Sequence, residues 1–248
     1  MKISVITPSV RPEMLEIVKK CLKRQTFTEV EWIVVGNKEV CESMGHYYSS
    51  HQITRLTEIN PSFNTVVSIE PPKKEGDFYG LNKAWNTGLK QARDELFVSI
   101  VDGLWFPPET LERLWQHYER DPMSCISFAG HHYDKEEHGK PEHLVWVDPK
   151  VKDTGALEQI SPVDFELCIA SMPMKGVREV GGFDEEFDKF PAWSEKELAC
   201  RMERVGYKFY IDHSIQFRAV HHPRLKDSEW DKKFPESSVY FQKCVNEI

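Results

Sequence analysis

Apolar and polar positions alternate along the first half of the chain in the pattern of strands followed by helices. Short runs at Ile3–Thr7 and Trp32–Val35 predict buried strands. Leu15, Val18 and Leu22 lie between them at helical spacing and predict one apolar helix face. A strand, a helix and a strand within about 35 residues form a βαβ unit, so we expect a parallel sheet with right-handed crossovers.

The alternation continues beyond this unit. We expect a short strand near Val66–Ile69, a helix over Gly80–Ala92, a buried strand over Leu96–Val101 and a helix that starts at Pro107. This order is typical of an open, doubly wound sheet, in which ligands bind at the carboxyl ends of the strands. The first candidates for a site are therefore the residues that follow strands: Pro8 and Ser9, Gly36 and Asn37, and Asp102 and Gly103.

After Pro122 the pattern changes to short alternating runs, which predict antiparallel strands around a charged turn at 134–143. The segment from His221 is polar, and we expect it to be solvated. Between these parts we expect strands at Ser124–Ala129, His143–Val147, Phe165–Ala170, Lys208–Ile211 and Ile215–Val220, and a helix at Glu195–Val205.

Composition narrows the class of protein. The chain has 248 residues, 40% of them hydrophobic and 29% charged, which is typical of a globular protein. The net charge of −8 argues against a protein that coats nucleic acid through bulk charge. We find no apolar run of about 18 residues and no signal peptide. The six cysteines form no CxxC pair, so we expect reduced thiols in a cytoplasmic protein and no structural zinc.

Four segments carry a family resemblance through their order and spacing. They are ISVITPSVRPEMLEIVKKCLKRQTF, GLNKAWNTGLKQARDELFVSIVDG, VDGLWFPPETLERL and VGGFDEEFDKFPAWSEKELACRMERVGYKFY. In this order they resemble the family 2 glycosyltransferases. The resemblance implies an α/β protein with the GT-A fold: a Rossmann-like, mostly parallel central sheet with helices on both faces and a smaller antiparallel acceptor-side lobe. It further implies one domain over 1–248, with a nucleotide-sugar-binding half at 1–105, an acceptor-side half at 106–220 and a C-terminal tail at 221–248.

The resemblance also implies a reaction. A sugar would pass from a nucleotide diphosphate donor, usually a UDP-sugar, to a hydroxyl acceptor, with inversion by direct displacement. A divalent metal, Mn²⁺ or Mg²⁺, would stabilise the charge of the departing diphosphate, and a carboxylate would take the proton of the hydroxyl. The implied nucleotide contacts are Thr7, Pro8, Ser9, Arg11, Asn37, Lys83, Asn86 and Asp102.

The chain departs from the family pattern at the metal site. Relatives carry Asp-x-Asp where this chain has Asp102, Gly103 and Leu104, and a leucine cannot bind a metal. One carboxylate with phosphate and water can still hold Mg²⁺ or Mn²⁺. His221 and His222 are candidate additional ligands, with an ordinary polar loop as the alternative. A metal-independent site is left open.

Three other nucleotide candidates have structural alternatives. Relatives often have an aspartate where this chain has Asn37; its amide can bind a base or ribose, but Gly-Asn is also common turn chemistry. Lys83 and Asn86 lie on the predicted helix before Asp102 and could reach the nucleotide. An ordinary exposed helix face is the alternative, and it is the favoured interpretation for Lys83.

The resemblance places the general base at Glu195, with Glu197 as the next candidate. Ser194 and Glu197 also have the spacing of a capping box, and a helix dipole favours Glu195 in a first turn. The two interpretations are compatible. Asp184 and Trp193 are acceptor-side candidates; loop structure and core packing are their alternatives.

Two other functions are weighed against the enzyme. Leu104 and Asn37 motivate a catalytically silent nucleotide-sugar-binding module. A phage-type enzyme that glycosylates hydroxymethylated pyrimidines in DNA is the second, although a solvated tail explains the same residues more simply. The residues that motivate it are Arg218, Arg224, Lys226, Lys232 and Lys233, with His132 and His221.

Overall fold

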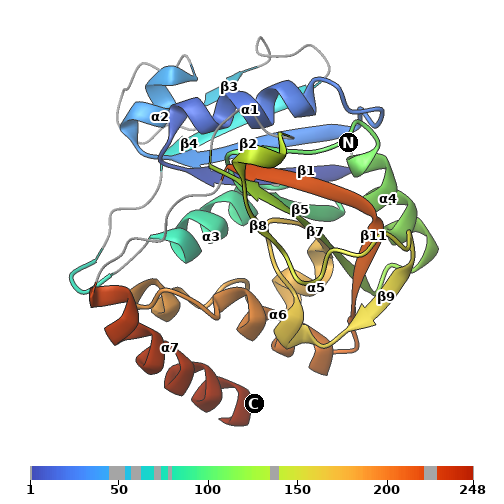
Figure 1. The fold of residues 1–248 in the computed structure, drawn as a ribbon. Coiled ribbons are helices and arrows are strands. Elements are labelled where there is room, and N and C mark those ends of the chain that lie inside the picture. The colour runs from blue at the N-terminus through green and yellow to red at the C-terminus, as the bar shows by residue number, and fades with distance from the viewer. Residues whose placement is uncertain are drawn as a thin grey trace.

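The computed structural model describes residues 2–44, 54–56, 63–69, 74–77, 80–134, 140–220 and 228–247 (Figure 1). Their strands form one sheet in the order β3-β4-β2-β1-β5-β10-β7-β11-β6, with β8 paired to β7 and β9 paired to β11. The strands are β1 (Ile3–Ser9), β2 (Val30–Gly36), β3 (Thr54–Leu56), β4 (Phe63–Ile69), β5 (Leu96–Ile100), β6 (Leu104–Trp105), β7 (Ser124–Tyr133), β8 (Leu144–Val147), β9 (Leu157–Ile160), β10 (Ile169–Pro173) and β11 (Lys208–Val220).

The direction of the strands changes in the middle of the sheet. β4, β2, β1 and β5 run parallel, as the βαβ pattern predicts. β10 then pairs antiparallel with both β5 and β7, and β11 pairs antiparallel with β6 and β9. The prediction of a mostly parallel sheet with a smaller antiparallel part is confirmed. The two predicted halves share this sheet, and the boundary at residue 105 stays a prediction.

Helices cover both faces of the sheet because the central strands are apolar on both sides. In β1, Ile3 and Val5 join a core with α1, α2 and α4, whereas Ile6 joins a second core with α3, α5 and α6. The helices are α1 (Pro12–Leu22), α2 (Lys38–Ser43), α3 (Leu81–Gln91), α4 (Thr110–Arg120), α5 (Met174–Glu179), α6 (Ser194–Arg204) and α7 (Ser228–Glu247), with short 3-10 turns η1 (Pro141–His143), η2 (Pro162–Asp164) and η3 (Glu185–Lys189).

Some predicted elements differ from the structure. The two strands predicted at Lys208–Ile211 and Ile215–Val220 are one strand, β11, which has an irregularity between Ile211 and Gln216 that a sequence pattern reads as a break. The strand predicted from Phe165 begins only at Ile169. α2, α5, β3, β6 and β9 were not predicted.

The largest difference is at the C-terminal end, where the expected solvated segment contains α7. This helix extends along the same side of the molecule as α6 (Figure 1). Phe241 of α7 is only 3% exposed, so the helix buries apolar surface there. No helix among the described residues has the length and apolar character needed to cross a membrane.

Candidate functional site

The adjacent ends of β1 and β5 bring together Ser9, Arg11 and Asp102. The Asp102 side chain is 5% exposed, and both of its carboxylate oxygens have donors. Oδ2 accepts hydrogen bonds from Ser9 Oγ and from Arg11 Nε, the latter at 3.1 Å, and Oδ1 accepts from Arg11 Nη2. Three residues of the predicted nucleotide site therefore form one polar cluster at the carboxyl edge of the sheet.

Three other predicted nucleotide contacts near this edge are buried or engaged within the protein. The Thr7 side chain is fully buried and accepts a hydrogen bond from Trp32 Nε1 at 3.0 Å. Pro8 is a buried residue of β1. Asn37 is the N-cap of α2, where its Oδ1 accepts from the Val40 backbone N–H at 2.9 Å. The side chains of Thr7 and Asn37 are thus engaged within the protein.

The described residues around Asp102 do not suit the expected Mn²⁺ or Mg²⁺ ion. Arg11 and Ser9 occupy the carboxylate, and Leu104 in β6 is 2% exposed and packs in the core. No group of three or more His, Cys, Asp or Glu in the described part of the chain could hold a metal ion. His221 and His222 lie outside the described residues. A hard divalent cation needs several oxygen ligands, and here the one available carboxylate already has a cation.

A cavity of about 330 Å³ opens beside the end of β5. Its walls are mostly apolar, and a few polar side chains converge on it, which is the usual character of a small-molecule site. It is lined by Leu81, Asn82, Trp85, Val101, Glu166, Leu167, Cys168, Phe187, Phe190, Pro191, Ala192, Ser194 and Glu195.

Glu195, the predicted base, lines this cavity from the first turn of α6. Burial raises the pKa of its carboxyl, and the nearby Glu166 adds to the rise. The opposing contributions come from its own backbone N–H, from Lys196 and from the Ser194 hydroxyl, which lies 3.4 Å from Oε2. A carboxylate with a raised pKa binds a proton more readily near neutral pH, as a general base requires.

Sequence reasoning missed two polar residues of the cavity. Glu166 contacts Lys150 Nζ at 2.8 Å and Lys196 Nζ at 3.9 Å. Asn82 is 3% exposed, and its backbone N and Nδ2 donate to Asp188 Oδ1 at 2.7 and 3.0 Å. Its Oδ1 is buried and has no hydrogen-bond partner among the described residues.

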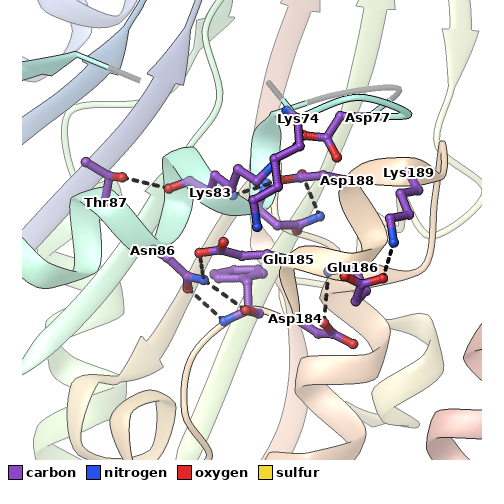
Figure 2. A network of polar contacts seen from close by, with 12 residues as sticks. Lys74, Asp77, Lys83, Asn86, Thr87, Asp184, Glu185, Glu186, Asp188 and Lys189 are labelled. Atoms are coloured by element: carbon purple, nitrogen blue, oxygen red, sulfur yellow. Dashed lines mark hydrogen bonds and ion pairs between the residues drawn. The ribbon is translucent and has the colours of Figure 1, made fainter. Parts of the chain in front are cut away.

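Lys83 is buried, so the favoured interpretation of an exposed helix face was wrong. Its side chain is 4% exposed and lies between two carboxylates (Figure 2). Nζ contacts Asp77, and it lies 3.9 Å from Asp188 Oδ2. Asp188 also accepts from the backbone N–H groups of Asn82 and Lys83, and so caps α3 from a distant segment. The lysine charge is therefore balanced within the protein.

Asn86 and Asp184 hold the GGFDE loop (Figure 2). Asn86 Nδ2 donates to the Phe183 carbonyl at 2.9 Å, and its Oδ1 accepts from the Phe183 N–H at 2.9 Å. Asp184 accepts from the Glu186 N–H at 2.9 Å and from the Tyr240 hydroxyl at 2.8 Å. Both amide ends of Asn86 are engaged, and Asp184 connects the loop to α7.

The other candidates on α6 have structural contacts. Glu197 is 3% exposed and forms a two-point ion pair with Arg201, at 2.6 and 2.7 Å. The capping box was wrong, because α6 starts at Ser194 and its N-cap is Trp193. Trp193 has a φ of 79° and stacks on Phe241 of α7 with ring centroids 4.9 Å apart. It therefore joins the start of α6 to the C-terminal helix.

Comparison with known proteins supports the same family as the sequence. Residues 73–179 match the model of glycosyl transferase family 2. No curated protein matches the chain significantly.

Among solved structures, S. aureus TarS has a TM-score of 0.67 at 14% identity, over 99% of this chain and 39% of that chain. TarS 1–349 in complex with UDP has a TM-score of 0.66 at 15% identity, and its complex with UDP-GlcNAc has 0.64 at 13%. These two matches cover 99% and 100% of this chain but 64% and 71% of theirs. The family match covers less than half of the chain, and over the whole chain the structure has the GT-A fold that these structures share.

Proposed function

We propose that this chain transfers a sugar from a nucleotide diphosphate donor, most simply a UDP-sugar, to an acceptor hydroxyl with inversion. The observation that carries the proposal is the position of Glu195, which lines a cavity at the carboxyl edge of the sheet and has a raised pKa. The similarity to structures of TarS with UDP and UDP-GlcNAc supports the choice of donor. A cytoplasmic location is part of the same proposal.

In this mechanism Glu195 takes the proton of the acceptor hydroxyl. The hydroxyl oxygen bonds to the anomeric carbon while the bond from that carbon to the diphosphate oxygen breaks. The nucleotide diphosphate leaves with the electron pair, and attack from the opposite side inverts the anomeric centre. A single base suffices for such a direct displacement.

The remaining cavity residues suit a sugar. Trp85 and Phe187 supply apolar surface for the carbon face of a ring. A saccharide is the acceptor class we favour. The DNA alternative is weaker: Lys233 Nζ donates to the Lys189 carbonyl at 3.3 Å, and Arg224 and Lys226 lie outside the described residues.

The test is a screen of nucleotide sugars against saccharide, small-alcohol and hydroxymethylated-DNA acceptors, read by mass spectrometry. Glu195→Gln should lower the transfer rate by about 10²–10⁴-fold, because it removes the base. Glu179→Gln is the matched control on an exposed position of α5 and should retain the wild-type rate.

The pH dependence gives a second readout. The rate should fall with decreasing pH through a Glu195 pKa above the ordinary value of 4.5. Transfer by Glu195→Gln at the wild-type rate would refute the assignment of the base. Binding of donors without any transfer would favour the silent module instead.

A further inference from the structure

The Arg11–Asp102 pair lies where the fold family implies a metal. Asp102 corresponds to the first aspartate of Asp-x-Asp, and its two oxygens face the guanidinium of Arg11. The second aspartate is replaced by Leu104, which is buried in the core. The cation that pairs with Asp102 is therefore the guanidinium of Arg11, an organic cation held in a fixed position.

On the basis of the proposed function, we propose that Arg11 holds the donor diphosphate and that donor binding requires no divalent metal. Asp102 acts as a positioning residue, since it orients the guanidinium through Nε and Nη2. In the described contacts Nη1 is not engaged, and the side chain is 33% exposed, so its remaining N–H groups are available to a ligand. Arginine binds phosphate oxygens through two parallel hydrogen bonds, which an ammonium group cannot reproduce.

The backbone around Arg11 supports an anion at this position. Arg11 is the N-cap residue of α1, and Pro12 opens that helix. The positive end of an 11-residue helix thus lies next to the guanidinium. Its partial charge partly offsets the negative charge of Asp102, which by itself would repel a diphosphate.

The same arrangement assigns Arg11 a role in the transfer step. When the bond between the anomeric carbon and the diphosphate oxygen breaks, negative charge accumulates on the leaving group. A guanidinium held in place before the reaction stabilises that charge without reorganisation. Arg11 would then affect both the binding of the nucleotide diphosphate and the rate of its departure.

Calorimetry of UDP and of uridine, in excess EDTA and in excess Mn²⁺, tests the proposal. The wild-type chain should bind UDP with affinities that differ by less than about twofold between the two media. Arg11→Ala should weaken UDP binding by at least about tenfold and uridine binding by less than twofold, because uridine has no phosphate. The UDP affinity of Arg11→Lys should lie between those of the wild type and Arg11→Ala. Arg120 is an exposed arginine at the end of α4, and Arg120→Ala should bind UDP like the wild type.

The outcomes separate this proposal from the proposed function. UDP binding that needs Mn²⁺, or an Arg11→Ala variant that binds UDP like the wild type, overturns the role of Arg11 and leaves the transferase proposal standing. Failure of every nucleoside diphosphate in a panel to bind in either medium overturns both. If Arg11→Ala does not fold, as judged by circular dichroism, the EDTA comparison and Arg11→Lys still decide.

Discussion

Asp94 is a buried carboxylate at the amino-terminal edge of the sheet, and its replacement should stabilise the protein. Burial raises its pKa from 3.8 to about 6, and the negative charge of Glu31 adds to the rise. Asp94 Oδ2 has no hydrogen-bond partner among the described residues. Glu31 is 2% exposed, and its position near Asp94 is fixed by hydrogen bonds that it accepts from Ser4 Oγ and the Arg93 N–H.

The magnitude follows from the shift in pKa. Between pH 3.8 and about 6 the folded chain holds a proton on Asp94 that the unfolded chain has lost. Stability therefore falls as the pH rises through this window and is constant above it. A shift of about 2 units corresponds to at most about 3 kcal/mol. Because the new amide must also find partners, we expect Asp94→Asn to stabilise by about 1–2 kcal/mol above pH 7.

Urea denaturation at pH 4 and pH 7.5 measures this effect. The difference in unfolding free energy between Asp94→Asn and the wild type should be small at pH 4 and reach its full value at pH 7.5. Glu119→Gln removes a carboxylate from an exposed position of α4 and should show no such change. A difference that does not depend on pH, or a destabilised Asp94→Asn at pH 7.5, would refute the reasoning.

Two further substitutions test the packing around the sheet. Asp212 is fully buried and accepts from Arg113 Nε at 2.8 Å, and the pKa of Asp212 lies below its ordinary value despite burial because hydrogen bonds stabilise the carboxylate. Asp212→Asn should cost about 2–4 kcal/mol at pH 7 in urea denaturation, and this cost should shrink as the pH falls below 4; a cost that is constant with pH would contradict it. Phe241→Ala should cost about 2–4 kcal/mol and lower kcat more than UDP affinity, since Phe241 stacks on Trp193 beside the proposed base. Val239→Ala, at a position 71% exposed on the same helix, should change neither, and an equal loss of kcat and affinity in Phe241→Ala would contradict a positioning role.

The parts of the fold that the sequence predicted are those with local signals. β1, β2 and β5 are short apolar runs, and α1 and α4 have clear apolar faces. The sequence pattern missed α7 because Pro235 and many charged residues interrupt its apolar positions. The apolar side chains of this helix pack against Trp193 and the loop before it. The C-terminal segment thus depends on tertiary packing for its structure.

The site was predictable to the extent that its residues follow strands. Ser9, Arg11 and Asp102 could be grouped because parallel strand ends meet at one edge. Asp188 could not be recognised as the cap of α3, because 106 residues separate it from Asn82, whose backbone N–H donates to it. Glu197 was a poorer candidate than it looked, since its i,i+4 spacing from Arg201 already offered an ion pair.

The acidic segment from Asp184 to Glu197 shows how the fold places the proposed base, Glu195, differently from the neighbouring carboxylates. Glu195 contacts the Ser194 hydroxyl at 3.4 Å and its own backbone N–H, and burial dominates its pKa. It is also the carboxylate of this segment that lines the cavity. The others have stronger partners: Asp184 with Tyr240, Glu185 with Asn86, Glu186 with Lys189, Asp188 with Asn82 and Lys83, and Glu197 with Arg201. These contacts fix the loop and the helix that present Glu195 to the cavity, so the position of the proposed base depends on its acidic neighbours.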